Sequence, residues 1–240
     1  MSLYKFIEKE FFDEFFLTGS LRLGTLEDFK KTEEHGGHRG DVSEGKHNVY
    51  RHVDDKLILT ADTLPSEPLI SSSIHMDPAS NQDSVTLSNV LFIDERNSQD
   101  VLTFCTSRVY STHLFSEWNQ KESLNYCYEI FDIKGFITAI SNALSARSKG
   151  NKFKACDLVA YTNKNIDYRS KYSKVHPCFL KDNDYAWQHE VRMVWAFDDI
   201  HKKQDVIIMN VPEAIKFCRK HAYIERGEIK YLSSFKKYFK

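Results

Sequence analysis

The clearest alternation of apolar and polar positions in the chain runs over residues 185–197. Every second position there carries a large aromatic, aliphatic or imidazole side chain: Trp187, His189, Val191, Met193, Trp195 and Phe197. Side chains two residues apart share a face of a β-strand, so this alternation predicts a strand. Gln188, Glu190 and Arg192 then line the opposite face at intervals of about 7 Å. That face is either the wall of a cleft or an ordinary solvated face of a sheet.

The rest of the chain predicts more strands than helices. Apolar, β-branched and aromatic runs predict strands over residues 3–6, 20–26, 56–61, 85–94, 101–107, 126–131, 158–161 and 206–211. Apolar residues at helical spacing predict helices over 7–17 and 134–144, with a short helix over 27–31 and another over 212–221. Residues 63–84 and 162–175 are predicted to be irregular connections.

Three residues indicate where these helices begin or end. Gly19 follows the first one where a C-capping glycine stands, Asp132 precedes the second as an N-cap, and Pro212 occupies the first turn of the last. Strands and helices do not alternate regularly. The class is therefore α+β, with a mostly antiparallel mixed sheet and flanking helices in a single domain over residues 1–240.

Composition and charge limit the possible partners. The 240 residues include 33 Lys and Arg against 34 Asp and Glu, so no overall field attracts nucleic acid or an anionic membrane. Five widely spaced cysteines argue for a reducing compartment. The N-terminal sequence lacks the pattern of a signal peptide, and no apolar run reaches 18 residues. We therefore expect a cytoplasmic protein without a membrane partner. The basic, aromatic segment 230–240 is either a docked terminus or a phosphate contact.

Residues 33–45 form the most polar stretch, with four glycines among charged residues and histidines. Such a loop either carries binding residues or is a plain surface connection. His35, His38, His47 and His52 lie close together in sequence, but no further ligand stands at a diagnostic spacing, and no metal site is expected. Sequence motifs for a phosphate loop, a dinucleotide-binding Rossmann turn and a serine hydrolase are absent.

The polar face of the 185–197 strand is the remaining candidate for chemistry. A carboxylate beside an amide and a guanidinium suits a reaction that develops positive charge on a sugar. With a nicotinamide leaving group, which is already cationic, no general acid is needed and one carboxylate is enough. Arg192 could bind a diphosphate bidentately or pair with Glu190 on the same face.

Two short motifs resemble those of the ADP-ribosyltransferase superfamily. Gln188-His189-Glu190 resembles the Gln-x-Glu motif that these enzymes carry at the start of a late strand, where the second acid contacts the nicotinamide ribose of NAD. The segment 104–107, Phe-Cys-Thr-Ser, is similar to their hydrophobic-Ser-Thr-Ser strand. In the enzymes an arginine or histidine on the first strand grips NAD; Lys5 stands at that position here.

A second resemblance spans most of the chain. A group of bacterial domains of uncharacterised activity shares the Leu-Tyr-Lys-Phe start at 3–6, the Gly-Thr-Leu segment within 21–29 and the Gln-x-Glu-x-Arg strand. Arg39-Gly40-Asp41 with Glu44-Gly45, and the segment 179–181, also fit that group.

The resemblances imply an ADP-ribosyltransferase-like fold and an enzyme that cleaves the bond between nicotinamide and ribose in NAD. ADP-ribose would pass to an unknown protein or nucleic-acid acceptor, in a bacterial defence or toxin system. Its partner would be a second copy of the chain or an operon-encoded protein. The implied catalytic residues are Glu190, which stabilises the ribosyl cation, and Gln188, which positions the acceptor. The implied NAD-binding residues are Lys5, Arg22, Thr25, Arg39, Thr106, Ser107 and Arg192.

Two other functions remain open at this point. One is a non-catalytic binding or sensing module of a defence system, using residues 35–45 and the C-terminal segment. The other is a metal-dependent nuclease in which Asp41, Glu44 and Glu190 gather a divalent ion.

Overall fold

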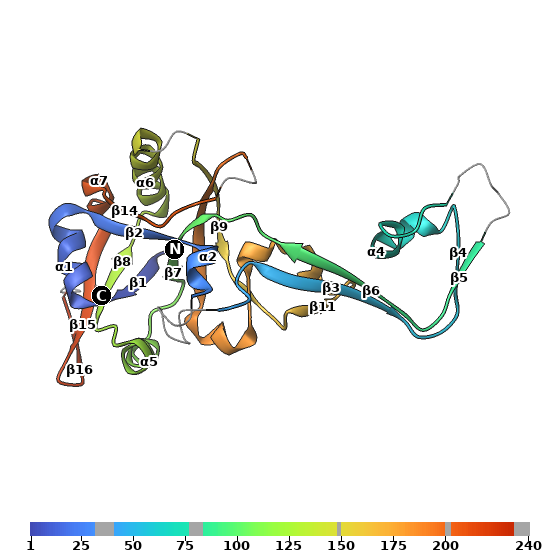
Figure 1. Cartoon of the computed structure of the whole chain (residues 1–240). Helices are drawn as coiled ribbons and strands as arrows, with labels where there is room; N and C mark the ends of the chain where they lie inside the picture. The colour runs from blue at the N-terminus through green and yellow to red at the C-terminus, as the bar shows by residue number, and fades with distance from the viewer. Residues whose placement is uncertain (32–40, 77–83, 148–149, 200–202, 233–240) are drawn as a thin grey trace, which may run out of the picture.

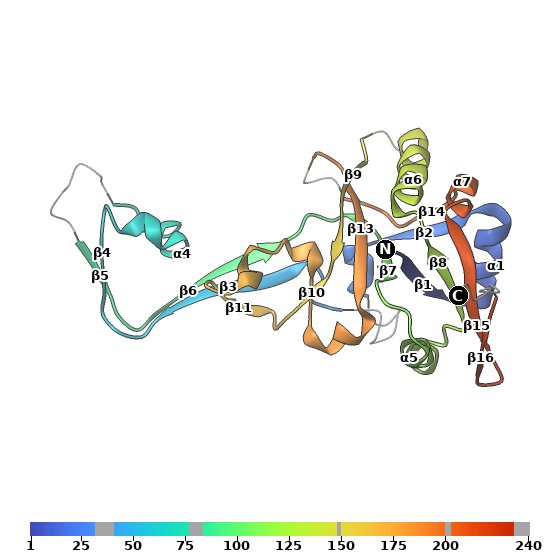
Figure 2. The ribbon, with the colours of Figure 1, turned by 180° about the vertical axis from the view of Figure 1, so that it is seen from behind.

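The computed structural model describes residues 1–31, 41–76, 84–147, 150–199 and 203–232 of the chain. These residues form a body around one large sheet and a narrow arm that projects from it (Figure 1). The reverse view shows the same division, with β3 and β6 running outward from the body (Figure 2). No helix among the described residues is long and apolar enough to cross a membrane.

The large sheet is antiparallel in every described strand pair. Its main path runs in the order β14 (Ile207–Asn210), β2 (Ser20–Thr25), β7 (Leu102–Ser107), β1 (Leu3–Ile7), β8 (Tyr126–Ile130), β15 (Cys218–Glu225) and β16 (Glu228–Tyr231). Off this path, β13 (Glu190–Ala196) pairs with both β7 and β9 (Lys152–Leu158). The predicted α+β class and mostly antiparallel sheet are confirmed.

The sheet opens beside β7. One edge of β7 pairs with β13 along its whole length, from Leu102 opposite Trp195 to Ser107 opposite Glu190. Its other edge is shared, because β2 pairs with Leu102 and Thr103 whereas β1 pairs with Ser107. Between these two contacts β1 and β2 diverge. This opening positions the candidate site.

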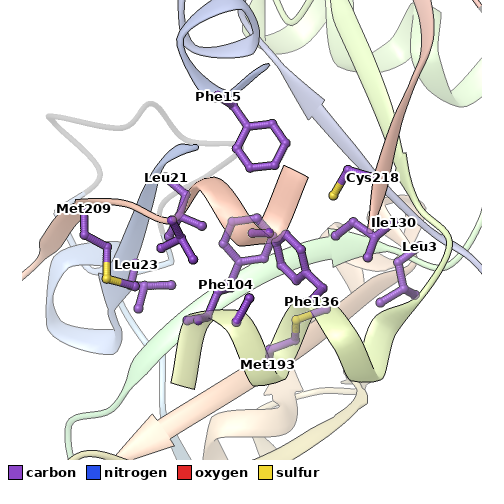
Figure 3. Close-up of a cluster of buried hydrophobic side chains, with 14 of the residues drawn as sticks. Leu3, Phe15, Leu21, Leu23, Phe104, Ile130, Phe136, Met193, Met209 and Cys218 are labelled. Carbon is purple, nitrogen blue, oxygen red and sulfur yellow. The ribbon is translucent and has the colours of Figure 1, made fainter. Parts of the chain in front are cut away.

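Three helices cover one face of the sheet: α1 (Lys9–Thr18), α6 (Ile133–Arg147) and α7 (Pro212–Ile215). Side chains from these helices and from β7 and β13, among them Phe15, Phe136, Phe104 and Met193, meet in one apolar cluster (Figure 3). Trp195 is fully buried in this cluster, and its indole N–H donates to the Ser141 hydroxyl on α6 at 2.9 Å. Burial of an aromatic side chain is a large favourable term, so the apolar row of β13 anchors the core.

The opposite face carries a second, smaller cluster. Phe6 of β1 and Cys127 of β8 pack there against Phe115 of α5 (Thr112–Glu122). Trp187 belongs to this cluster and packs on Trp118, with ring centroids 4.6 Å apart. The sheet is therefore covered on both faces near β1.

The predicted caps are confirmed. Gly19 ends α1 with a φ of 76°, and its N–H donates to the Phe15 carbonyl at 2.7 Å. A Cβ at Gly19 would lie 2.4 Å from the carbonyl carbon of Val211, so only glycine fits. Asp132 accepts a hydrogen bond from the Gly135 N–H at 2.9 Å and caps α6. The short helix α2 (Leu26–Phe29) is N-capped by Thr25.

The arm is built from strands that sequence reasoning found only in part. Antiparallel β3 (Lys46–Val53) and β6 (Val90–Asn97) form its ribbon, and β11 (Asn165–Asp167) runs parallel to β3. The tip holds β4 (Leu57–Thr60) paired with β5 (Ser84–Leu87), the 3-10 turn η1 (Leu64–Ser66) and α4 (Pro68–Ser71). A small apolar cluster of its own stabilises the tip.

The sequence predictions were wrong at five points in and beside the arm. The connection 63–84 contains the 3-10 turn η1 and the helix α4. The expected strand 85–94 is two strands, because Asn89 takes a positive φ of 51° and breaks the run. β3 lies in a segment without strict alternation and was not predicted. The connection 162–175 contains β11 and the 3-10 turn η2 (Lys171–Lys174). Residues 158–161 are the end of β9 and the separate strand β10 (Ala160–Tyr161), which pairs in parallel with β12 (Leu180–Lys181).

The last helix was also predicted too long. Helix α7 ends at Ile215, and residues from Cys218 onward form β15, which pairs with β8. The reason is tertiary, because the free edge of β8 offers hydrogen bonds that outweigh a weak helical pattern. In the structure the strand predicted over 185–197 begins only at Glu190, for a different reason. Asp182 caps the 3-10 helix η4 (Asn183–Gln188), and His189, with a φ of 47°, turns the chain into β13.

Candidate active site

A cavity of about 570 Å3 lies at the opening of the sheet. Its walls come from β1, β2, β7 and the start of β13, together with residues of α1 and β12. The size falls within the range typical of small-molecule sites, roughly 300–1,000 Å3. Five of the residues predicted from sequence to bind NAD line it: Lys5, Arg22, Thr106, Ser107 and Arg192. Both predicted catalytic residues, Gln188 and Glu190, line it as well.

Glu190 is the first residue of β13 and lies on the wall of the cavity, with only 5% of its surface exposed. Its backbone N–H donates to the Tyr161 hydroxyl at 2.8 Å. One carboxylate oxygen, Oε1, lies 2.5 Å from Nε of Arg192, and the other, Oε2, lies 3.2 Å from Nζ of Lys181. The carboxylate is thus held between two cations.

Arg192 extends this arrangement away from the cavity. Its guanidinium donates to both carboxylate oxygens of Glu44, at 2.5 and 3.1 Å, and to the Cys178 carbonyl at 2.8 Å. Glu44, Arg192, Glu190 and Lys181, here called the charge chain, are all at least nine-tenths buried. Their alternating charges cancel. Because its donors hold Glu190 and Glu44, Arg192 acts as the partner of Glu190, one of the two roles considered from sequence, and its contacts give no support to a diphosphate-binding role.

The charge chain fixes the ionisation of the site. Burial by itself would raise the pKa of Glu190, but the adjacent charges of Arg192 and Lys181 outweigh burial and hold that pKa well below its usual range. The same carboxylates raise the pKa of Arg192 further despite its burial. Burial raises the pKa of the Cys105 thiol, on the same wall, to about 12. At neutral pH Glu190 is therefore an anion and Cys105 a neutral thiol that is not poised as a nucleophile.

Gln188 reaches the site by a route that the sequence did not predict. It ends η4 instead of lying on β13, so the spacing of a strand does not place it beside Glu190. Lys181 of β12 joins the two residues, because its Nζ donates to Oε1 of Gln188 at 2.9 Å and also contacts Glu190. The Lys181 ammonium also lies 4.5 Å from the ring centre of Tyr185.

Two further cations line the cavity nearer its β1 and β2 walls. Nζ of Lys5 donates to the Cys105 carbonyl at 2.8 Å and lies 4.8 Å from the ring centre of Phe104. That carbonyl belongs to the stretch of β7 where β1 and β2 diverge. Arg22 of β2 pairs with Asp28 at 2.6 Å and keeps 40% of its side chain exposed. Both cations stand at the edges of the opening.

The remaining predicted residues have local roles. The Thr106 hydroxyl donates to the Val191 carbonyl at 3.2 Å, and the Ser107 hydroxyl donates to the Val109 carbonyl at 3.0 Å. Thr25 accepts a hydrogen bond from the Asp28 N–H and caps α2, and it is not among the described residues that line the cavity. Arg39 lies outside the described residues, as do His35 and His38.

Sequence reasoning missed Lys181 and Tyr161 as parts of the site. The available signal for Lys181 was its place in the Phe-Leu-Lys segment 179–181, a charged residue directly after apolar ones. Nothing in the sequence indicated that Tyr161 would meet Glu190. From sequence, Glu44 was part of the Glu44-Gly45 motif and a candidate metal ligand, whereas the structure pairs it with Arg192.

No three His, Cys, Asp or Glu side chains are gathered as a metal site within the described ranges. Asp41 pairs with Lys164 at 3.2 Å, and Glu44 and Glu190 pair with Arg192. These contacts give the nuclease alternative no support.

A buried histidine at the root of the arm makes stability depend on pH. His47 is 4% exposed, and neither of its ring nitrogens has a hydrogen-bond partner among the described residues. Burial, together with the nearby Arg96 and Lys164, lowers its pKa to about 4. A lowered histidine pKa means that the unfolded chain gains a proton first, so stability is lost as pH falls from about 6.5 toward 4.

We expect His47→Phe to remove much of this loss, because a phenyl ring fills the same space and does not titrate. Urea unfolding at pH 7, 6, 5 and 4 measures it, with the exposed His52→Phe as the control. An identical pH slope in wild type and His47→Phe would show that His47 is not the group responsible.

Comparison of the chain with protein-family models, with curated proteins and with solved structures found no match.

Proposed function

We propose that the cavity binds NAD and that the protein cleaves the bond between nicotinamide and ribose, passing ADP-ribose to an acceptor. The observation that carries this proposal is the position of Glu190, an ionised carboxylate on the wall of a cavity that also presents Lys5 and Arg22. Glu190 supplies a fixed negative charge at the wall where a ribosyl cation would form, and Arg192 and Lys181 offset part of that charge.

The cations supply the second part of the argument. NAD carries a diphosphate, and Lys5 and Arg22 stand at the two edges of the opening, on β1 and β2. An ammonium and a guanidinium are the usual partners of phosphate oxygens. A diphosphate between them would place the nicotinamide ribose toward β7 and Glu190.

The fold supports the resemblance to ADP-ribosyltransferases at one point. The Gln-x-Glu motif of that superfamily belongs at the start of a late strand, and β13 begins at Glu190. We infer an ADP-ribosyltransferase-like fold on this basis, with Glu190 and Gln188 in the motif positions.

Purified protein incubated with NAD labelled in its nicotinamide ring should release labelled nicotinamide faster than buffer alone. Arg22→Met should weaken NAD binding, measured by calorimetry, since it removes a diphosphate contact. Arg219→Met is the matched control, because Arg219 pairs with Glu129 outside the cavity. Absence of both binding and release would contradict the proposal, and an equal loss of affinity in both variants would contradict the assignment of Arg22.

A module that binds NAD without cleaving it is the second candidate function. It differs from the sensing module expected from the sequence, of whose surface residues 35–40 and 233–240 lie outside the described residues. The observation in favour of this second candidate is that both carboxylate oxygens of Glu190 are already paired with cations. Such a module would bind NAD, and its thermal midpoint would rise with NAD concentration. It would release no nicotinamide, which separates it from the enzyme.

A further inference from the structure

We propose that two copies of this chain associate through their arms, by antiparallel pairing of β6 with β6 of the second copy about a two-fold axis at Ile93. The inference does not depend on the proposed function, because no residue of the arm lines the cavity within the described ranges. It starts from the outer edge of β6.

That edge is free. β6 pairs with β3 along its whole length, and no described strand pairs with its other edge. The N–H and C=O groups of such an edge form a template for pairing with another chain, so edge strands are usually short, charged or covered. β6 has eight residues, and its outer half, Val-Leu-Phe-Ile at 90–93, contains neither a charge nor a proline. The arm carries this edge away from the body (Figure 1).

Side chains of the same half form an apolar face. Phe92 packs into the apolar cluster of the tip, whereas Leu91 and Ile93, on the opposite face of the ribbon, are 53% and 56% exposed. They lie opposite His52 and Tyr50 of β3, so this face extends across the ribbon. An exposed apolar face beside a free strand edge is typical of an interaction surface.

The distribution of charge along the arm identifies the partner as a second copy. The described residues of the tip, 54–76 and 84–89, carry one cation against four carboxylates: Lys56 against Asp54, Asp55, Asp62 and Glu67. The base of the arm, defined as residues 46–53, 90–97 and 165–174, carries six cations against three carboxylates: Lys46, Arg51, Arg96, Arg169, Lys171 and Lys174 against Asp94, Glu95 and Asp167. With neutral histidines the tip therefore has a net charge of −3 and the base a net charge of +3.

An antiparallel pair of arms matches these charges twice. The tip of each arm then lies beside the base of the other, and the two-fold axis repeats the contact. Lys171 and Lys174 are exposed on η2, and the Ser173 carbonyl between them in sequence accepts a hydrogen bond from Arg96, which brings η2 to β6. A parallel pair would instead set base against base and tip against tip. Ile93, near the middle of β6, faces its own counterpart at the axis.

Sedimentation equilibrium of the wild-type protein over a wide range of concentrations measures the association. We expect an equilibrium between monomer and dimer. Ile93→Lys should abolish the dimer, because a lysine on an edge strand opposes pairing and the axis brings two of them together. Leu17→Lys is the matched control and should leave the dimer intact, since Leu17 is 83% exposed on α1. A wild-type protein that stays monomeric at every concentration would overturn the proposal, as would a dimer that persists in Ile93→Lys.

Charge reversal tests the relative orientation of the arms. Asp54→Lys combined with Asp55→Lys should raise the dissociation constant of the dimer by about tenfold or more, because each tip then repels the opposing base. Adding Arg169→Glu and Lys171→Glu to the same chain reverses the base as well and should restore the affinity. All four residues are exposed, and unfolding curves verify that the variants are folded. An affinity unchanged by the first pair, or not restored by the second, would contradict the antiparallel arrangement.

A cysteine at the axis tests the register. Ile93→Cys should form an intermolecular disulfide when the dimer is oxidised with copper phenanthroline, because the two side chains are opposed across the strand pair. Leu17→Cys and the wild type, with its five native thiols, give the background. Absence of a cross-link in a variant that still forms the dimer would overturn pairing at Ile93.

Discussion

Replacing Arg192 by methionine is expected to lower the free energy of unfolding by about 3–5 kcal/mol. Arg192 is 1% exposed and holds the carboxylates of Glu44 and Glu190. Without it, two buried anions lie close together and only Lys181 remains to compensate one of them. Removing one partner of a buried ion pair is costly because the other charge stays desolvated. Urea unfolding at pH 7, followed by circular dichroism, measures the change.

Two comparisons make this test specific to the charge chain. Lys152→Met breaks an ion pair with Asp198 on the surface, and we expect its unfolding midpoint to stay close to that of the wild type. The double variant Arg192→Met/Glu44→Gln should lose less unfolding free energy than the sum of the losses in the two single variants. It lacks the uncompensated Glu44 carboxylate that Arg192→Met alone leaves buried. Strict additivity of the two losses, or a loss for Arg192→Met no greater than that for Lys152→Met, would show that the charge chain contributes little to stability.

Replacing Glu190 by glutamine is expected to reduce the rate of nicotinamide release by a factor of about 10²–10³. Glutamine keeps the shape of the side chain but carries no negative charge to stabilise the ribosyl cation. Because the positive charge on the ribose develops mainly in the transition state, kcat should fall much more than KM rises. Steady-state assays with nicotinamide-labelled NAD give both constants.

The matched control is Glu129→Gln. Glu129 is also buried and paired with an arginine, Arg219, but it does not line the cavity. Nicotinamide release should survive this change. Equal losses in both variants would mean that a buried carboxylate matters for folding and not for the reaction.

The pH dependence supplies a second check on Glu190. A carboxyl pKa lowered in the folded state keeps the group ionised through the ordinary glutamate range. The stability it adds is complete above the glutamate pKa of the unfolded chain and is lost progressively as pH falls from there toward the lowered value. The kcat for nicotinamide release should therefore stay level as pH falls from 7 through the usual glutamate pKa. A decline centred on the usual glutamate pKa would show that the two cations do not hold Glu190 as proposed.

Much of the fold follows from local pattern. The alternation Val191, Met193, Trp195 predicted a strand with a buried apolar face, and these residues lie in the main core. The caps at Gly19 and Asp132 were also correct. Errors arose where a neighbouring strand or turn decided the conformation. Residues after Cys218 became β15 because β8 offered a free edge, and local propensity is too weak to resist such pairing.

The candidate site was predicted only in part, because contacts between distant segments decide the rest of it. Period-two spacing brings Glu190 and Arg192 together, and they do pair. Gln188 was placed on that strand and lies in a 3-10 turn instead. Its contact with the site passes through Lys181, seven residues earlier, and no periodicity predicts that contact.

By itself the sequence determined an α+β chain with an antiparallel sheet, a strand near its C-terminal end that buries Trp195, and a pair of opposite charges two residues apart on the other face of that strand. These properties follow from periodicities of two to four residues in strands and helices, which depend only on residues that are close in sequence. Only the tertiary structure decided that β1 and β2 diverge along β7 to form a cavity, and that Glu44 and Lys181 complete a buried charge chain. Glu44 lies 148 residues from Arg192 in sequence. Desolvation and ion pairing at that separation depend on the fold as a whole, because each charge is stabilised only when its distant partner is in place.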